Sequence, residues 1–142
     1  MHQLPRPRAI LFDWDNTLVD TFPVIHASLN DTFAHMGHAA WTEAETRERI
    51  RLSLRDAFPR MFAERWEEAR DVFYAAFETR HLEALTPMPG IAAMMPDLAG
   101  LGVPLGVVSN KTGRYLRAEA AHLGWDPHFR ALVGAGDAAR NR

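Results

Sequence analysis

The chain contains no cysteine, which excludes a disulfide framework and thiolate metal sites. Any catalysis must therefore depend on carboxylates, hydroxyls, lysine or histidine. No apolar run approaches the ~18 residues that a membrane-spanning helix needs. The N-terminal stretch MHQLPRPRAI has two arginines but no apolar signal core. These features predict a cytoplasmic protein that is neither anchored to a membrane nor exported.

The chain also lacks a strong excess of positive or negative charge: it has 16 basic and 18 acidic residues, and its net charge is −2. This balance gives the chain no polycationic surface. We therefore expect neither nucleic acid nor an anionic membrane to be its main partner. Recognition must then come from a local site. The length of 142 residues, 47% of them hydrophobic, allows one ordinary core or a core domain with a small insertion.

In the first half of the chain, the sequence pattern of a short strand is followed by helical patterns only. Residues 8–14 (RAILFDW) form an apolar run typical of a strand. Residues 21–85 then show only helical patterns, such as a helix that Gly37 should stop. A second helix should begin at Thr42, because Glu45 three positions later completes a capping box. The pattern predicts an all-helical insertion.

After the turn TPMPG at 86–90, the sequence patterns of helices and strands alternate. The expected elements are, in order, a helix at 91–102 that Pro96 should shorten or kink, a buried strand at 103–110, a helix at 112–124 and a strand at 129–137. Strands alternating with helices predict a parallel sheet, whose ligands lie beyond the carboxyl ends of the strands. Polar clusters at 13–17 and 109–111 both fall at such ends.

Two aspartates, Asp13 and Asp15, end the first apolar run. They would face the same side if the strand ran through both. Two close carboxylates repel unless a cation lies between them or one holds a proton. Such a pair suits Mg²⁺, and a carboxylate can also act as a nucleophile that forms an aspartyl-phosphate. The alternative is that the aspartates only end a strand and cap a turn, in which Asn16 would tolerate positive φ.

The stretches FDWDNTLVD and LGVVSNK resemble the first two motifs of the haloacid dehalogenase (HAD) superfamily. The helical interval between them and the PMPG that follows resemble the phosphoglycolate phosphatase-like subgroup with an α-helical cap. The resemblance implies an α/β fold: a Rossmann-like, HAD-like parallel-sheet core at 1–20 and 87–142, discontinuous and incomplete at its C-terminal part, and an all-helical cap at 21–86.

Carried over by position, the resemblance implies that Asp13 is the nucleophile and a Mg²⁺ ligand. Asp15 would be the general acid/base and would bind the metal through its backbone carbonyl. An aspartate there implies phosphoryl transfer rather than dehalogenation. Thr17 would brace the motif turn, and Ser109, with Asn110 beside it, would hold the phosphoryl oxygens.

Four cationic residues are candidates for binding the phosphate or another anionic group of the substrate. Lys111 could supply one beside Ser109, although a solvated lysine is the commoner outcome after a strand. Arg142 stands about where the third-motif cation of the family belongs. Arg51 and Arg55 could meet an anionic substrate tail from the cap, or simply solvate a helix.

Together with the resemblance, these residues predict a Mg²⁺-dependent phosphatase acting on a small phosphate monoester, and the resemblance of the helical interval to the family's cap implies a phosphoglycolate-like substrate. A non-catalytic or partner-completed protein on the same scaffold, or a phosphomutase, are the alternatives. The acidic fourth motif of the family does not occur before residue 142, so we expect the chain to be a fragment of a longer protein. Its first strand would then be an apolar sheet edge, and a natural end at Arg142 would require a domain-swapped or partner-completed assembly. The oligomeric state is open.

Overall fold

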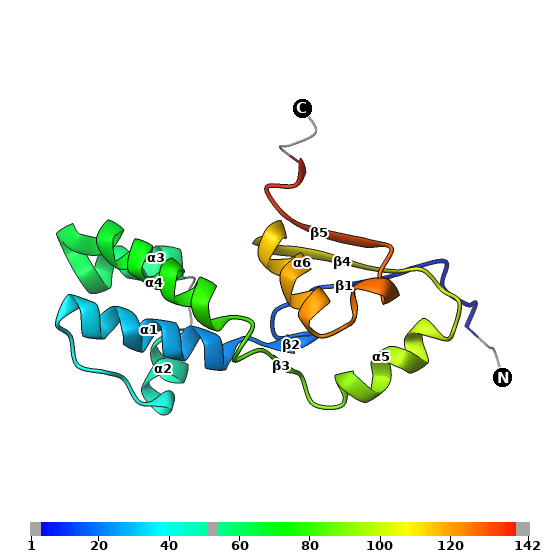
Figure 1. Ribbon diagram of the computed structural model, residues 1–142, viewed down its shortest axis with the longest axis horizontal. Helices are drawn as coiled ribbons and strands as arrows, with labels where there is room; N and C mark the ends of the chain where they lie inside the picture. Colours follow the sequence, from blue (N-terminus) through cyan, green and yellow to red (C-terminus); the bar gives the residue numbers. More distant parts are fainter. Residues whose placement is uncertain (1–3, 51–53, 139–142) are drawn as a thin grey trace. The chain divides into compact units, whose positions relative to one another are not determined.

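The computed structural model describes residues 4–50 and 54–138 of the chain. Contacts divide the chain into two compact units, drawn in Figure 1. One unit consists of Met1–Thr21 and Leu85–Arg142, and the other is Phe22–Ala84. No helix in the described part of the chain is long and apolar enough to span a membrane.

The first unit, called here the α/β unit, is built on a three-stranded sheet with the order β1-β4-β5. Its strands are β1 (Ile10–Phe12), β4 (Leu105–Thr112) and β5 (Ala131–Ala135). Both neighbouring pairs are parallel, and β4 lies in the middle (Figure 1). The parallel sheet predicted from strand–helix alternation is therefore confirmed.

The strand boundaries differ from the predicted ones, and two of the differences bear on the site. The first strand ends at Phe12, before the aspartate pair, because the Trp14 carbonyl accepts the N–H groups of Thr17 (3.2 Å) and Leu18 (2.9 Å) and turns the chain. The prediction of a strand through residue 14 was wrong. The central strand continues to Thr112, two residues beyond its predicted end, where it pairs with Ala135 after an irregularity in register.

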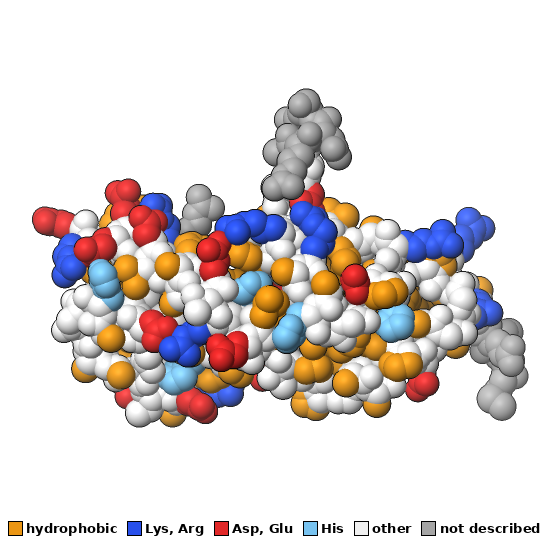
Figure 2. All heavy atoms as spheres, in the orientation of Figure 1, with side chains coloured by type: hydrophobic (Ala, Val, Ile, Leu, Met, Phe, Trp, Pro, Cys, Tyr) orange, Lys and Arg blue, Asp and Glu red, His pale blue; other side chains and the backbone are white. Residues whose placement is uncertain are grey.

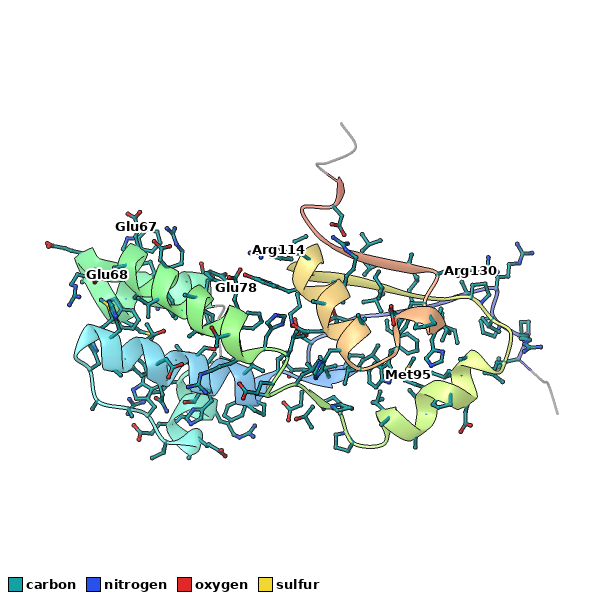
Figure 3. The ribbon with its side chains drawn as sticks, in the orientation of Figure 1. Glu67, Glu68, Glu78, Met95, Arg114 and Arg130 are labelled. Atoms are coloured by element: carbon teal, nitrogen blue, oxygen red, sulfur yellow. The ribbon has the colours of Figure 1, made fainter. Side chains whose placement is uncertain are left out.

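The α/β unit has its core on one face of the sheet. Helices α5 (Ile91–Ala99) and α6 (Gly113–His122) supply side chains to it. Met95 of α5, labelled in Figure 3, and Leu116 of α6 are fully buried in the same cluster as Val107 of β4. Helix α5 continues for three residues past Pro96, so this proline does not end it.

The other face of the sheet carries exposed apolar side chains. Leu11, Val108 and Val133 are 70%, 55% and 42% exposed, respectively. The strand registers Leu11↔Gly106 and Val108↔Val133 place them on a common face. In the described chain β1 has only β4 as a sheet neighbour and therefore forms an edge.

A short antiparallel ladder, which no sequence pattern predicted, joins the two segments of the α/β unit. Strand β2 (Val19–Asp20) pairs with β3 (Thr86–Pro87). Next to it, the Met88 N–H donates to the Leu18 carbonyl at 3.0 Å. Two-residue strands are too short to produce a visible alternation of polar and apolar residues, which is why the pairing was missed.

The second unit, called here the helical unit, contains only helices in its described residues. They are α1 (Phe22–Met36), α2 (Glu43–Arg49), α3 (Leu54–Phe62) and α4 (Trp66–Arg80), with a 3₁₀ turn at Ala63–Arg65. The capping box of Thr42 and Glu45 is present, and Gly37 follows α1 with φ +78°. Both predictions are confirmed.

The helical unit is held together by aromatic packing. The rings of Phe58, Phe62 and Phe73 are buried, and Phe58 meets the other two edge-on at 5.4 and 5.6 Å. On the surface, Arg80 of α4 donates to Asp31 of α1 at 2.6 Å. Figure 2 shows acidic and basic side chains interspersed over the helical unit on the side in view.

The start of α6 passes so close to β5 that no side chain fits between them. A Cβ built on Gly134 would lie 2.5 Å from the Gly113 Cα and 2.5 Å from the Lys111 carbonyl oxygen, both backbone atoms. We expect Gly134→Ala to lower the free energy of unfolding by about 1–3 kcal/mol, because the backbone must move to admit the methyl group. Denaturant unfolding measures this change.

Gly100→Ala is the matched control. Gly100 has φ −72°, and a Cβ there would make ordinary contacts of 3.4 and 3.5 Å. Its free energy of unfolding should stay within about 1 kcal/mol of the original. Equal effects of the two substitutions would contradict the close approach of α6 to β5.

Candidate active site

A tight loop follows β1 and carries the first polar cluster. Asp13 is exposed, and its Oδ1 accepts the N–H of Trp14 at 2.8 Å. Asn16 has φ +61°, a conformation that asparagine tolerates, and its N–H donates to the Val19 carbonyl at 2.7 Å. Thr17 is exposed and contributes to the turn through its N–H bond to Trp14.

The two carboxylates have different surroundings, because the strand ends before them and alternation no longer governs their direction. Asp13 faces solvent, whereas the Asp15 side chain is 33% exposed. Asp15 Oδ1 accepts a hydrogen bond from Lys111 Nζ at 2.7 Å. The expectation that strand alternation aligns the pair is therefore corrected: a turn sets their positions.

The pKa of Asp15 is raised above the usual value of 3.8, chiefly because burial disfavours the ionised form. The adjacent Lys111 ammonium opposes this shift but does not cancel it. The negative charges of Glu119 and Asp13 add smaller contributions in the upward direction. A carboxyl with a raised pKa holds its proton to higher pH, which suits a group that donates a proton.

Ser109 lies near the carboxyl end of β4, the strand that pairs with β1. Phe12 is opposite Val107 in the register, so the residues that follow each of them emerge at the same edge of the sheet. The half-buried Ser109 accepts the N–H of Lys111 on its Oγ at 3.1 Å, and Asn110 is exposed. Parallel pairing thus brings the two predicted polar clusters to one edge.

Lys111 is the only lysine in the sequence, and it is buried rather than solvated. Its side chain is 7% exposed. The ammonium lies between two carboxylates, 2.7 Å from Asp15 Oδ1 and 2.8 and 3.0 Å from the two oxygens of Glu119. The solvated lysine considered from sequence is thus corrected, because a buried ammonium needs such partners.

Glu119 is a site residue that sequence reasoning missed. It lies on α6, is 0% exposed, and accepts the indole N–H of Trp14 at 3.0 Å. Trp14 itself is fully buried, with Trp125 edge-on at 6.0 Å. A signal was present: Glu119 stands three residues after Leu116 on the inward stripe of the helix, where a charge is unusual.

Other predicted residues lie elsewhere or outside the described structure. Arg142 and Arg51 are outside the described residues, and Arg55 falls in α3 with its side chain outside them. Asp137, the last residue of the strand predicted at 129–137, lies beyond β5, where it accepts the N–H of Gly134 at 2.7 Å and pairs with Arg117 at 2.9 Å. Among the described residues, no group of three or more His, Cys, Asp or Glu side chains could hold a metal ion.

A comparison with protein families decides the relationship. The profile of the family described as haloacid dehalogenase-like hydrolase matches residues 10–142. The chain belongs to this family. The match includes both polar clusters and the helical unit between them. The resemblance seen in the two motifs is confirmed.

Individual haloacid dehalogenase-like relatives agree with this assignment. A phosphoglycolate phosphatase from Xylella fastidiosa is 31% identical over 96% of this chain, and one from Rhodobacter capsulatus is 27% identical over 94%. This chain covers 61% and 64% of their lengths. A haloacid dehalogenase-like family protein from Streptococcus pneumoniae superposes with a TM-score of 0.80 at 22% identity, over 92% of this chain and 62% of that one. The chain therefore spans less than two thirds of the relatives that it matches.

The raised pKa of Asp15 makes a prediction about stability. A raised pKa in the folded state means that the ionised carboxylate is less favourable there than in the unfolded chain. The contribution of Asp15 to stability is thus fully present below the unfolded pKa of about 3.9 and is lost as the pH rises through the folded value. The asparagine of Asp15→Asn stays neutral at every pH. The free energy of unfolding of this variant, relative to that of the original protein, should therefore rise between pH 3.5 and 7.

Chemical denaturation in the presence of a chelator measures this difference across the pH range. Asp97→Asn, on the exposed side of α5, is the control, because it also removes one carboxylate but at an exposed position. If the original protein instead gained on Asp15→Asn toward neutral pH, the attraction of Lys111 would outweigh burial and the direction of the shift would be wrong.

Proposed function

We propose that this protein hydrolyses a small phosphate monoester with Mg²⁺ through an aspartyl-phosphate on Asp13. The observation that carries the proposal is the set of groups at one edge of the sheet. An exposed carboxylate, Asp13, stands two residues before a partly buried carboxyl with a raised pKa, Asp15. Ser109 follows the adjacent parallel strand. A nucleophile, a proton donor and a phosphate-binding hydroxyl would thus serve one phosphoryl group.

In the first step, a carboxylate oxygen of Asp13 attacks phosphorus and the bond from phosphorus to the ester oxygen breaks. Asp15 gives its proton to the departing ester oxygen, which leaves as an alcohol. The phosphoryl group is then bound to Asp13. Ser109 donates its hydroxyl to a phosphoryl oxygen, which offsets the charge that accumulates on it.

In the second step, water attacks the phosphorus of the aspartyl-phosphate. Asp15, now ionised, takes a proton from that water, and the bond between phosphorus and the Asp13 oxygen breaks. Inorganic phosphate leaves, and both carboxyl groups return to their starting states. The same residue acts first as acid and then as base, and the raised pKa of Asp15 favours its role as the acid.

The residues present suit Mg²⁺ as the metal of such a site. This ion keeps several waters and is commonly held by one or two carboxylates together with substrate phosphate oxygens. Asp13 is exposed, and its Oδ1 is the oxygen bonded to the Trp14 N–H, so Oδ2 is the natural ligand. The Asp15 backbone carbonyl would be the second protein ligand. Bound Mg²⁺ would neutralise charge on the phosphate oxygens.

Phosphoglycolate is the first substrate to test, because several relatives carry the name phosphoglycolate phosphatase. We infer that the helical unit, Phe22–Ala84, is the family's cap domain and contributes to substrate selection. The sequence expectation that the cap arginines bind the anionic tail of the substrate belongs to this inference and awaits experiment.

Asp13→Asn tests the nucleophile in the protein as its cell produces it. Inorganic phosphate release from phosphoglycolate and a panel of other monoesters is measured with and without Mg²⁺. Asparagine cannot form the acyl phosphate, so kcat should fall by more than about 10³-fold, as for other lost nucleophiles. Addition of a chelator to the original protein should abolish activity.

Asp97→Asn removes a carboxylate from the exposed side of α5 and should keep full activity. Mg²⁺-dependent release by Asp13→Asn at the original rate would overturn the nucleophile assignment. An original protein that is inert toward every monoester would overturn the phosphatase itself. Phosphate passed to a sugar phosphate rather than to water would identify a phosphomutase.

A further inference from the structure

A buried acidic residue remains that the proposed reaction does not use. Glu119 lies on the inward stripe of α6 beside Leu116 and Ala120, both 0% exposed. Moving a carboxylate from water into such surroundings is costly unless the charge is paired and hydrogen-bonded. Glu119 meets both conditions through Lys111 and the indole of Trp14.

The two partners of Glu119 are each adjacent to one of the reacting carboxylates, Asp13 or Asp15. Trp14 follows Asp13 in the chain, and its indole N–H donates to Glu119 Oε1 at 3.0 Å. Lys111 donates to both oxygens of Glu119 and, at 2.7 Å, to Oδ1 of Asp15. One buried carboxylate thus ties helix α6 to Trp14, which follows the nucleophile in the chain, and through Lys111 to Asp15.

A purely stabilising ion pair would be a weak explanation for this arrangement. Buried ion pairs often contribute no more stability than well-packed apolar residues of similar volume, since their desolvation offsets the attraction. Geometry points elsewhere. A lysine has a flexible four-carbon stem, and its ammonium keeps one position only where several acceptors surround it. Glu119 supplies two of those acceptors to Lys111, and Asp15 supplies another.

We propose that Glu119 is a positioning residue: it holds the Lys111 ammonium on Oδ1 of Asp15, so that Oδ2 of Asp15 is the oxygen that exchanges the proton with the substrate. This inference rests on the proposed phosphatase activity. Glu119 touches neither substrate nor metal. Its effect reaches the reaction through the orientation of the Asp15 carboxyl group, which must present one particular oxygen to the leaving group.

Two substrates with different leaving groups distinguish a positioning role of Glu119 from a general loss of structure in the variant. An alkyl phosphate such as phosphoglycolate needs a proton on its departing oxygen, whereas p-nitrophenolate departs without one. Glu119→Gln keeps the side-chain size and an acceptor for Trp14 but loses the charge that holds Lys111. We expect kcat/KM for phosphoglycolate, which reports the steps up to departure of the alcohol, to fall about tenfold, a part of the ~10²–10⁴-fold that general acid catalysis contributes. The kcat/KM for p-nitrophenyl phosphate should change less than threefold. Any loss in the second step, where Asp15 acts as base, is common to both substrates and does not enter kcat/KM.

The single lysine provides a readout that does not depend on activity. Acetic anhydride labelling of the protein as its cell produces it, followed by mass spectrometry of the peptide that contains Lys111, reports how firmly this ammonium is held, because Lys111 is the one lysine among residues 1–142. In Glu119→Gln the labelling of Lys111 should be roughly tenfold faster, since a hydrogen bond to a charged group is lost. Glu67→Gln, an exposed change on α4 at the position labelled in Figure 3, should label and turn over like the original.

Glu119→Asp is the second variant if Glu119→Gln fails to fold. It keeps the charge but is shorter by one methylene group, so it should move the ratio of the two kcat/KM values in the same direction. Equal losses of kcat/KM on both substrates, or unchanged Lys111 labelling, would overturn the positioning role while leaving the phosphatase intact. An original protein without any phosphatase activity would overturn the proposed function, and the labelling alone would then decide whether Glu119 holds Lys111.

Discussion

The buried ammonium of Lys111 is the constraint on which the α/β unit depends. A positive charge with 7% of its side chain exposed requires negative partners, and Asp15 and Glu119 supply them from two different parts of the chain. To satisfy it, α6 must turn Glu119 inward, and the loop after β1 must fold back toward β4. In the same loop Trp14 is buried in the core and Asp13 is exposed.

Sheet geometry brings these groups together. Because β1 and β4 are parallel neighbours, the loop after β1 and the end of β4 emerge at one edge. The close approach of Gly134 to the backbone of Lys111 and Gly113 locks the start of α6 onto β5. The lysine is thus held by its backbone through packing and by its side chain through charge. A haloacid dehalogenase-like core uses both to order one short loop.

Local patterns were enough to predict much of the fold. The capping box at Thr42 and the stop at Gly37 depend on residues a few positions apart, and the structure contains both. The boundaries of the strands were wrong because a strand ends where its partner or a turn ends it, and neither is visible in a single segment. The ladder of β2 with β3 was missed for the same reason.

By itself, the sequence determined the family, the parallel α/β order, the helical insertion and the two polar clusters, because each of these is written in contiguous residues and their spacing. Only the tertiary structure decided that Asp13 and Asp15 differ in exposure, that Lys111 is buried, and that Glu119 belongs to the site. These properties arise where residues 96 positions apart meet, as Asp15 and Lys111 do. Burial and charge pairing between distant segments cannot be read from either segment alone, since the pKa of Asp15 depends on what surrounds it in the folded chain.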